Sequence, residues 1–462
     1  MRTARTGEGR LIAGWGRTAP TRARIEEVHR PQDVARALAA AGPRGIVARG
    51  LGRSYGDVAQ NAGGHVLHMR GLSGIRQLDT GRGLVRVAAG TSLDRLLREL
   101  VPLGWLPPVL PGTRFVTIGG ALANDVHGKN HHRDGGFADH VEDLTIVTAD
   151  GHPRRITPST DPDAFAATAG GLGLTGVVTE VALRLLPITT AHMVVDTDRT
   201  ADLDELMARM QQEDHRYRYS VAWVDCLARV RQLGRGVLTR AEHALSDQLG
   251  PRRSRRGRAF RARTLGAVPP GVPRLVGRAT AAAFNEAWFR KAPRRERGRV
   301  RSLASFFFPL DAVGEWNRLY GPRGLIQYQL AVPDGQERAV VAAIERLSRA
   351  GCPSSLAVLK RFGPGRGMLS FPIAGWTLAL DLPAAHGGLG RVLDGLDELV
   401  VEAGGRVYLA KDARLRPELL REMYPELEAW REVRAAMDPD RMFRSDLERR
   451  LMVAGDERKE TW

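Results

Sequence analysis

The 462-residue sequence predicts an α+β protein of two domains, the second of which is built on an antiparallel sheet with helices on one face. Two observations lead to this fold class. Short strand-like and helix-like segments alternate up to about residue 190, whereas longer strands of alternating polarity, separated by amphipathic helices, follow from 191 to 405. The remaining segment, 406–462, is expected to return to the first domain and to be helical around Tyr408–Lys411.

The first domain begins with an extended stretch, Ala23–Val28, and a helix, Pro31–Leu38, which has Asp33 in its first turn and ends before a Gly-Pro stop. A short apolar strand is expected at Gly45–Ala48. A second helix is expected over Ser92–Leu100, where Ser92 is a suitable N-cap. Further strands are predicted at Val66–Met69, Leu84–Ala89, Leu144–Thr148 and Val177–Leu186.

The second domain alternates between period-2 and period-3.6 patterns, which is typical of strands and amphipathic helices respectively. Strands are predicted at Tyr217–Val224, Leu325–Val332, Leu356–Lys360 and Trp376–Asp381. Helices are predicted at Leu203–Met210, Arg338–Ser348 and Leu389–Ala403, the last ending at two glycines.

The composition excludes several classes of protein. Hydrophobic residues make up 43% of the chain, an ordinary value for a globular protein. The two cysteines, Cys226 and Cys352, lie far apart, so neither a disulfide framework nor a metal site is expected. No run of 18 apolar residues and no signal-peptide pattern occurs, and we therefore expect a soluble protein made in the cytoplasm.

The net charge of +17 is concentrated in one segment. Between Pro251 and Arg301 the chain has 16 Arg or Lys and two acids, with the densest run at Arg252–Arg258. We expect a mobile, solvated basic insertion around 250–301. Attraction to phosphate, either on a ligand or on an anionic membrane surface, is the alternative interpretation of this segment. Nucleic acid is not expected, because zinc-finger spacing and aromatic RNA-binding motifs are absent. A basic phosphate-polymer or membrane-surface binding protein stays open as the alternative class.

A glycine-rich loop follows the strand at Gly45–Ala48. Three glycines within seven residues allow positive φ and a close approach of the backbone to a ligand, so the loop predicts an anion site suited to a diphosphate. The loop lacks both G-x-G-x-x-G opening a helix and the P-loop motif. Its residues are Arg49, Gly50, Leu51, Gly52, Arg53, Ser54, Tyr55, Gly56 and Asp57.

Three later segments repeat the pattern of glycines beside small apolar residues, at 111–125, 127–132 and 170–178. Together with the loop, their order and spacing resemble the vanillyl-alcohol-oxidase type, or PCMH type, of FAD-binding domain. This resemblance implies FAD as the cofactor and the first loop as the pyrophosphate site. Besides the loop, the cofactor-binding residues that it implies are Gly112, Thr117, Ile118, Gly119, Gly120, Asn124, Asp125, His127, Gly173, Val178 and Tyr408.

Over nearly its whole length the chain also resembles the decaprenylphosphoryl-β-D-ribose 2-oxidase flavoprotein family. The matching strings include LPGTR at 110–114, HGKNHH at 127–132, GEWNR at 314–318 and AKD at 410–412. Members of this family oxidise the ribose 2-hydroxyl of a polyprenyl-phosphate sugar to a ketone, the first half of a cell-wall epimerisation. The resemblance therefore implies a lipid-linked sugar phosphate as substrate and a keto-sugar reductase as partner.

The same resemblance implies roles for individual residues. Lys411 and His127 are the expected catalytic residues beside the flavin, and FAD is expected to be noncovalent, because the matching histidine of these oxidases is not attached to it. A cation such as Lys411 would also stabilise developing negative charge. The expected substrate-binding residues are Tyr55, Lys129, Trp223, Phe307, Gln327, Gln329, Lys360, Thr377 and Ala379.

Three of these positions depart from the family pattern. Members carry Tyr, Asn and Cys where this chain has Phe307, Thr377 and Ala379. A site that has lost hydrogen-bonding groups rejects a ligand that needed them. Oxidation of another sugar or of a nucleoside alcohol is therefore an alternative function.

Overall fold

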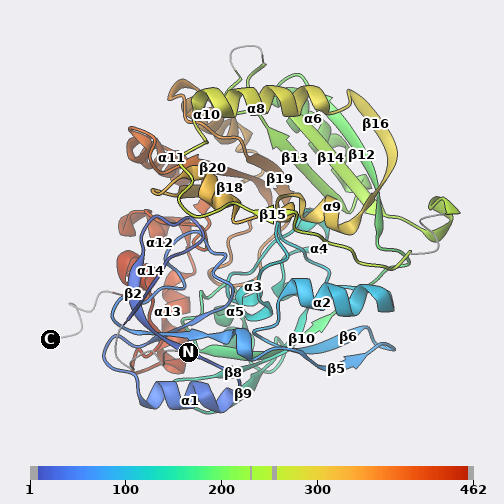
Figure 1. Cartoon of the computed structure of the whole chain (residues 1–462). Coiled ribbons are helices and arrows are strands. Elements are labelled where there is room, and N and C mark those ends of the chain that lie inside the picture. Colours follow the sequence, from blue (N-terminus) through green and yellow to red (C-terminus); the bar gives the residue numbers. More distant parts are fainter. Residues whose placement is uncertain (1–8, 229–231, 252–256, 456–462) are drawn as a thin grey trace.

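The computed structural model describes residues 9–228, 232–251 and 257–455, and Figure 1 shows two sheet-based halves stacked on each other. The lower half holds the elements up to residue 187, and the upper half holds an eight-stranded sheet that begins at residue 192. The predicted α+β class is confirmed.

The lower half has two main sheets, a mixed one of order β1-β2-β4-β3 and an antiparallel one of order β5-β6-β10-β8-β9. The first contains β1 Arg10–Ile12, β2 Thr21–Glu27, β3 Ile46–Arg49 and β4 His65–His68. The second contains β5 Ile75–Asp79, β6 Leu84–Ala88, β8 Val141–Val147, β9 Pro153–Ile156 and β10 Val177–Arg184, and a small pair is formed by β7 Trp105–Leu106 and β11 Leu186–Pro187. The helices are α1 Pro31–Ala39, α2 Leu93–Leu100, α3 Ile118–Ala123, α4 His131–Asp134 and α5 Pro162–Thr168.

The upper sheet is antiparallel throughout, in the order β16-β12-β14-β13-β19-β20-β18-β21. Its strands are β12 His192–Thr200, β13 Tyr219–Val224, β14 Gly236–His243, β16 Arg295–Ser302, β18 Leu325–Pro333, β19 Ala357–Phe362, β20 Gly375–Pro383 and β21 Arg406–Val407. A short parallel pair lies outside it, β15 Gly266–Ala267 with β17 Val313–Gly314. The helices are α6 Leu203–Glu213, α8 Arg278–Lys291, α9 Leu303–Phe307, α10 Glu337–Arg349 and α11 Leu389–Glu402.

The two faces of this sheet have different roles. On β20, Leu378, Leu380 and Leu382 pack into the same core as the apolar sides of α6, α10 and α11. The intervening residues of β20, Thr377 and Asp381 among them, point the other way because successive strand residues alternate between faces. This polar face lies opposite the helical layer, and it carries most of the predicted substrate-binding residues.

The C-terminal segment corrects one prediction. Tyr408–Lys411 is not helical, because β21 pairs with β18 and the chain then turns. The helices of this segment come later, as α12 Leu420–Met423, α13 Leu427–Met437 and α14 Asp446–Leu451. The segment then reaches the lower half, where Phe443 bridges Ile46 of β3.

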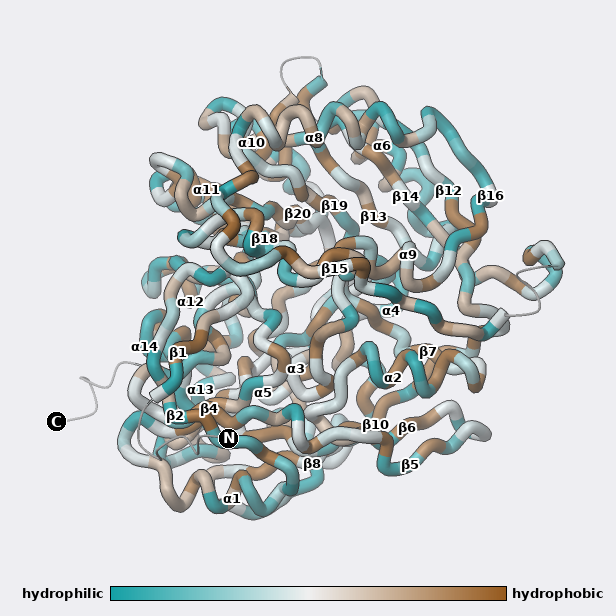
Figure 2. Tube along the Cα trace, viewed as in Figure 1, coloured by the Kyte–Doolittle hydropathy of each residue, from teal (hydrophilic) through white to brown (hydrophobic). Residues whose placement is uncertain are grey.

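The basic segment also needs a correction, since it is not only an insertion. Its end forms β16, an edge strand that pairs with β12 and is largely hydrophilic in Figure 2. Before it lies the helix α8. The densest basic run falls largely on residues 252–256, which lie outside the described residues. Among the residues that the structure does describe, none of the helices has the length and apolar character to cross a bilayer.

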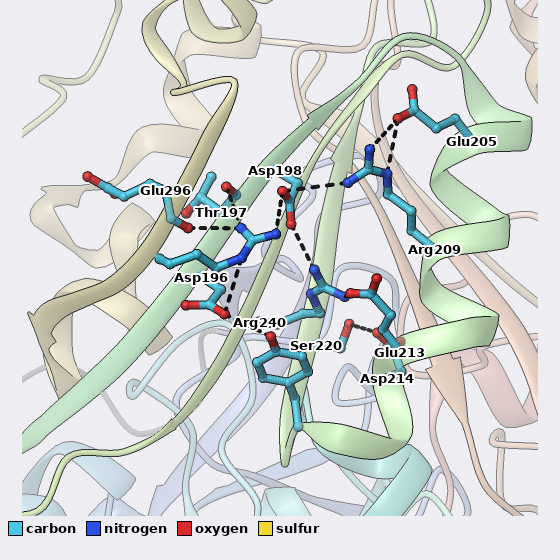
Figure 3. Close-up of polar contacts among 12 residues, drawn as sticks. Asp196, Thr197, Asp198, Glu205, Arg209, Glu213, Asp214, Ser220, Arg240 and Glu296 are labelled. Carbon is cyan, nitrogen blue, oxygen red and sulfur yellow. Dashed lines mark hydrogen bonds and ion pairs between the residues drawn. The ribbon is translucent and has the colours of Figure 1, made fainter.

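A buried ion-pair network fixes the distal edge of the upper sheet (Figure 3). Arg240 of β14 is fully buried and pairs with Asp198 of β12 at 2.7 Å and with Glu213 at the end of α6. Arg297 of β16 contacts the same Asp198 carboxylate at 2.8 Å. The network therefore links three strands and one helix.

We expect Arg240→Leu to lower the free energy of unfolding by about 3–5 kcal/mol, because it leaves the Asp198 carboxylate buried with fewer partners. Denaturant unfolding of the variant measures this effect. Arg30→Leu, which removes an exposed arginine 3.7 Å from Asp33, is the control and should cost about 0–1 kcal/mol. Equal losses in the two variants would contradict this account of the network.

Candidate active site

The glycine loop after β3 is packed so tightly that side chains cannot replace its glycines. A Cβ on Gly50 would lie 2.1 Å from Thr117 Oγ1, and one on Gly56 would lie 1.7 Å from the Asp412 carbonyl oxygen. Gly52 has a φ of +63°, the left-handed region that favours glycine. Among the described residues, none accepts a backbone hydrogen bond from the N–H groups of Gly50, Gly52 or Ser54. These donors are free for an anionic ligand.

Arg53 supplies a cation to the same loop. Its guanidinium lies 3.9 Å from the Trp15 ring centroid and 5.4 Å from that of Phe115. The Nε atom is buried without a hydrogen-bond partner in the described part of the chain. Burial lowers the pKa of Arg53, yet an arginine stays charged at neutral pH. A half-buried cation with an unused donor fits a diphosphate.

The other glycine segments complete a cradle. Thr117 caps α3 by accepting a hydrogen bond from the Gly120 N–H, and a Cβ on Gly119 would lie 3.0 Å from that of Ala89. By contrast, a Cβ on Gly112 or Gly173 would meet no atom within 4 Å. Near these segments Ile118 is buried, whereas Leu51 and Ser54 are half-buried. The buried Oδ1 atom of Asn124 has no hydrogen-bond partner in the described chain. The cradle combines tight backbone packing with open space and unused polar atoms.

Some residues predicted to bind the cofactor are engaged with the protein instead. Arg49 donates to the carbonyls of Ala13 and Ala59, so it braces the loop. The carboxylate of Asp125 accepts hydrogen bonds from Ser370 and from the Ala138 N–H, and burial raises its pKa to about 6. Direct side-chain contacts of Arg49 and Asp125 with a cofactor are therefore not favoured. Val178 of β10 is largely buried in the core of the lower half.

Asp57 is the clearest case, since it forms a bidentate ion pair with Arg450 of α14 at 2.9 and 3.0 Å. Arg450 also lies 2.8 Å from the carboxylate of Asp412, the residue after Lys411. A carboxylate held in this way cannot bind a diphosphate, and it instead ties the glycine loop to the turn that carries Lys411. Sequence reasoning missed Arg450, which lies 393 residues from its partner Asp57.

Three lysines, each from a different element, form a cationic end of the polar face. Burial lowers the pKa of Lys129 and of Lys360 to about 7 and that of Lys411 to about 8. Mutual repulsion lowers the pKa of Lys360 further, whereas Asp381 opposes the decrease for Lys411. No carboxylate of the described chain raises the pKa of Lys129 or Lys360. Lys129 donates to the Phe306 carbonyl, and neither it nor Lys360 has a carboxylate partner in the described chain, so both half-buried cations fit an anionic group of a substrate.

His127 lies beside these lysines in an aromatic cage. Its ring centroid is 4.7 Å from that of Phe362 and 5.2 Å from that of Tyr408, whose hydroxyl donates to the Asn124 carbonyl. The side-chain amide of Gln329 donates to His127 Nε2 at 3.0 Å, which leaves Nδ1 protonated and without a partner. Burial and the nearby lysines hold the pKa of His127 well below its usual range. The geometry favours a neutral hydrogen-bond donor over a proton acceptor.

The same polar face carries a carboxylate that sequence reasoning did not select. Asp381 of β20 lies in register with Gln327 of β18, whose side-chain amide donates to it. Burial raises the pKa of Asp381 to about 6, while Gln327 and Lys411 favour its charged form. Tyr55 lies close to both Gln327 and Asp381 and interacts with each of them. The alternation Thr377, Ala379, Asp381 was the available signal for this residue.

Three buried acceptor atoms on this face have no hydrogen-bond partner in the described chain, namely Gln327 Oε1, Gln329 Oε1 and Asp381 Oδ2. Buried acceptors need donors. Because the two glutamines lie opposite Asp381 and Ala379 in the β18–β20 ladder, the three acceptors form a row that suits a ligand with several hydroxyl groups.

The remaining predicted substrate residues surround this row. Thr377 is fully buried and donates to the Leu330 carbonyl, and Ala379 is 9% exposed. Trp223 of β13 is half-buried and donates to the Ser355 carbonyl. Phe307 lies in the aromatic core, 5.5 Å from the Lys129 ammonium and 5.0 Å from the Tyr219 centroid. Phe307 therefore lies behind Lys129 and is linked to the polar face only through that lysine.

The unused donors of the glycine loop, the open cradle and the adjacent polar face fit FAD. We expect this FAD to be noncovalent, since the lone pair of His127 Nε2 already accepts the Gln329 hydrogen bond and Nδ1 carries the proton. Acid precipitation of the purified protein should release the yellow colour into the supernatant, where its absorbance is measured. Colour retained in the pellet would show a covalent link.

Comparisons with known proteins agree with this geometry. A family model described as "FAD binding domain" matches residues 23–157, and one described as "D-arabinono-1,4-lactone oxidase" matches residues 390–451. The decaprenylphosphoryl-beta-D-ribose oxidase of Mycolicibacterium smegmatis is 43% identical over 449 residues, covering 96% of this chain and 97% of the relative. A Streptomyces coelicolor relative, "Uncharacterized protein in mprA 5'region", is 44% identical over 369 residues, 78% of this chain and 99% of its own. The L-gulono-1,4-lactone dehydrogenase of Mycobacterium tuberculosis is 24% identical over 443 residues, 91% of this chain and 94% of its own. The predicted FAD cofactor is confirmed.

Proposed function

Because the chain belongs to the decaprenylphosphoryl-β-D-ribose oxidase family, an FAD-dependent group of oxidoreductases, we propose that it oxidises the 2-hydroxyl of a polyprenyl-phosphoryl ribose to a ketone. The observation that carries the proposal is the polarity of the pocket. Three lysines, two of them without a carboxylate that raises their pKa, lie beside a row of acceptors that have no hydrogen-bond partner in the described chain. A sugar phosphate combines the matching charge and hydroxyl groups.

The protein's own groups have distinct tasks in this reaction. The N–H groups of the glycine loop and Arg53 would hold the diphosphate of FAD. When bound, FAD supplies the flavin ring that accepts hydride from the substrate. Lys129 and Lys360 would bind the substrate phosphate, and Asp381 with Gln327 would orient the ribose hydroxyls. Lys411 would stabilise the negative charge that develops in the pocket as the hydroxyl proton and the hydride leave.

The test is turnover of polyprenyl-phosphoryl ribose by the purified holoenzyme with a dye as electron acceptor. Dye reduction should accompany loss of two hydrogens from the sugar, and trapping with borodeuteride should place deuterium at C2. Deuterium at another carbon, or no dye reduction, would contradict the proposal.

A second candidate is oxidation of another sugar or of a nucleoside alcohol. It is favoured by Phe307, Thr377 and Ala379, which replace hydrogen-bonding residues of the family. Turnover of such an alcohol with a kcat/KM above that of the ribose lipid would support it.

Two associations follow from the proposed reaction. A keto-sugar reductase would consume the product, since an isolated ketone is only half of an epimerisation. A lipid-linked substrate also requires the protein to work at a membrane surface, at least transiently.

We expect a plot of kcat/KM for the phosphorylated substrate against pH to be a narrow bell, with an acid limb near pH 6 and an alkaline limb near pH 7–8. A phosphodiester keeps its charge over this range, so the limbs report the free enzyme. The acid limb is protonation of Asp381, whose pKa is about 6, and the alkaline limb is loss of charge from Lys129, Lys360 and Lys411, whose pKa values are about 7 to 8. Initial rates in overlapping buffers measure the profile, and a flat profile between pH 5 and 9 would contradict this assignment.

A further inference from the structure

We infer that the exposed face of α8 docks the protein on an anionic membrane surface, which would let the lipid tail stay in the bilayer while the sugar phosphate enters the pocket. The role in substrate delivery rests on the proposed function. The docking itself rests on three features of the described chain: the exposed aromatic pair Phe284 and Trp288 at the margin of α8, the charge of the segment, and its position beside the polar face.

The helix α8 is attached through one side only. Ala281 and Asn285 are its buried residues, and the Asn285 amide donates to Asp225 at 2.8 Å and to the Ser354 carbonyl at 3.1 Å. Phe284 and Trp288, one turn apart, border this attached side and are still 48% and 43% exposed. Their rings stack with centroids 6.0 Å apart and an angle of 14° between planes. Figure 1 shows α8 at the top of the molecule, along its periphery.

The chain that leads into α8 is equally apolar and exposed. Leu265 is 84% exposed and Leu275 is 51% exposed. Within the described chain, four of the ten exposed large hydrophobic side chains therefore fall between residues 265 and 288. The four side chains are neighbours in sequence, and Phe284 and Trp288 also contact each other.

The charge of the segment matches an anionic surface. Residues 257–301 contain 12 Arg or Lys and only two acids, Glu286 and Glu296. Glu286 pairs with Arg235 and Arg290, and Glu296 lies 3.6 Å from Arg301. Exposed aromatic side chains among arginines favour contact with an anionic membrane interface. A protein partner with an acidic groove is the competing occupant, which the test below separates.

The segment also borders the pocket. Asn285 of α8 contacts Ser354, and the next residue, Ser355, accepts a hydrogen bond from Trp223 at 3.1 Å. The Leu275 N–H donates to the Leu319 carbonyl at 2.8 Å, and the adjacent Tyr320 lies close to both Ser355 and Asp381. A lipid tail that leaves the pocket over this rim would reach the apolar face of α8.

The experiment measures co-sedimentation of the full-length holoenzyme with phosphatidylglycerol-containing vesicles and with pure phosphatidylcholine vesicles. The wild type should bind the anionic vesicles, and high salt should weaken the binding. The double variant Phe284→Ser/Trp288→Ser should lower the vesicle partition coefficient at least about tenfold. The matched control Leu11→Ser/Leu103→Ser removes two apolar side chains, 62% and 52% exposed, from the lower half and should bind within about twofold of the wild type.

A second comparison tests the role of charge. The test variant is Arg278→Glu/Lys291→Glu, at the two ends of α8, and the control variant is Arg10→Glu/Arg76→Glu, in the lower half. Only the first pair should weaken vesicle binding. Absence of vesicle binding, or equal binding by all variants, would overturn the inference. Retention of the wild type by a protein partner instead of vesicles would overturn it as well.

Turnover distinguishes the docking from the proposed reaction. With a short-chain prenyl-phosphoryl ribose in solution, Phe284→Ser/Trp288→Ser should keep the wild-type kcat/KM, whereas with the long-chain substrate in vesicles its rate should fall at least about fivefold. If the wild type binds vesicles but oxidises neither substrate, the proposed function fails and the docking stands. An equal loss on both substrates would contradict the delivery role.

Discussion

Replacing Lys411 by methionine is expected to lower kcat by about a hundredfold or more while leaving FAD bound. Methionine keeps the unbranched apolar stem but removes the charge. Lys411 is the lysine with the highest pKa of the three in the pocket, about 8, so it is mostly protonated at neutral pH. Its ammonium lies 5.8 Å from the Tyr55 ring centroid and 5.9 Å from that of Tyr408. Losing one preorganised group that stabilises developing charge typically costs ~10²–10³ in rate.

Single-turnover reduction of the bound flavin, followed by its absorbance under anaerobic conditions, measures this effect on the chemical step. Lys411→Arg is the matched variant, because it keeps the charge, and it should recover part of the rate. Lys291→Met, on the exposed end of α8, is the control for loss of a lysine in general. Near-normal flavin reduction in Lys411→Met would exclude the catalytic role.

The sequence predicted the framework of the site well because it depends on short periodic patterns. The alternation in Leu325–Val332 and Trp376–Asp381 places the polar face of β18 and β20 within two residues of the observed strands. The glycine loop was recognisable because close packing excludes a Cβ at Gly50 and Gly56. Local patterns of this kind can be recognised in the sequence without knowledge of the folded structure.

Features that depend on long-range contacts could not be predicted in the same way. The apolar run at Tyr408–Lys411 suggested a helix, but pairing of β21 with β18 and the hydrogen bond from Tyr408 N–H to the Gln329 carbonyl make it a strand end and turn. The charged sequence of β16 has no hydrophobic alternation because an edge strand can be polar. Asp57 gave no sign of its distant partner, Arg450.

Asp381 shows why a titratable residue is hard to assign from sequence alone. The alternation of β20 places Asp381 on the polar face but does not reveal its role, which arises from its neighbours in the folded chain. The structure buries it fully, pairs one oxygen with Gln327 and leaves the other without a partner among the described residues. Within the described ranges it is also the only group that raises the pKa of Lys411. Its removal should therefore have two measurable consequences.

We expect Asp381→Asn to lower kcat/KM about 10- to 200-fold, the range for losing a hydrogen bond to a charged group of about 1.5–3 kcal/mol. The same variant should move the alkaline limb of the pH profile to lower pH, because Lys411 loses the carboxylate that raises its pKa. The acid limb near pH 6 should disappear, because Asp381 is the carboxylate of the polar face whose pKa is about 6; a limb that persists would point to Asp125, whose pKa is similar. Steady-state rates between pH 5 and 9 measure all three changes.

The matched control is Asp397→Asn, which removes a buried carboxylate from the helical side of the same sheet. Asp397 accepts a hydrogen bond from Tyr328 at 2.9 Å and pairs with Arg414 at 2.7 Å. Its loss should destabilise the fold but leave both limbs of the pH profile in place, because it does not face the lysines. If Asp397→Asn moved the limbs as far as Asp381→Asn does, the shifts would reflect a general weakening of the sheet, and Asp381 would have no specific link to Lys411.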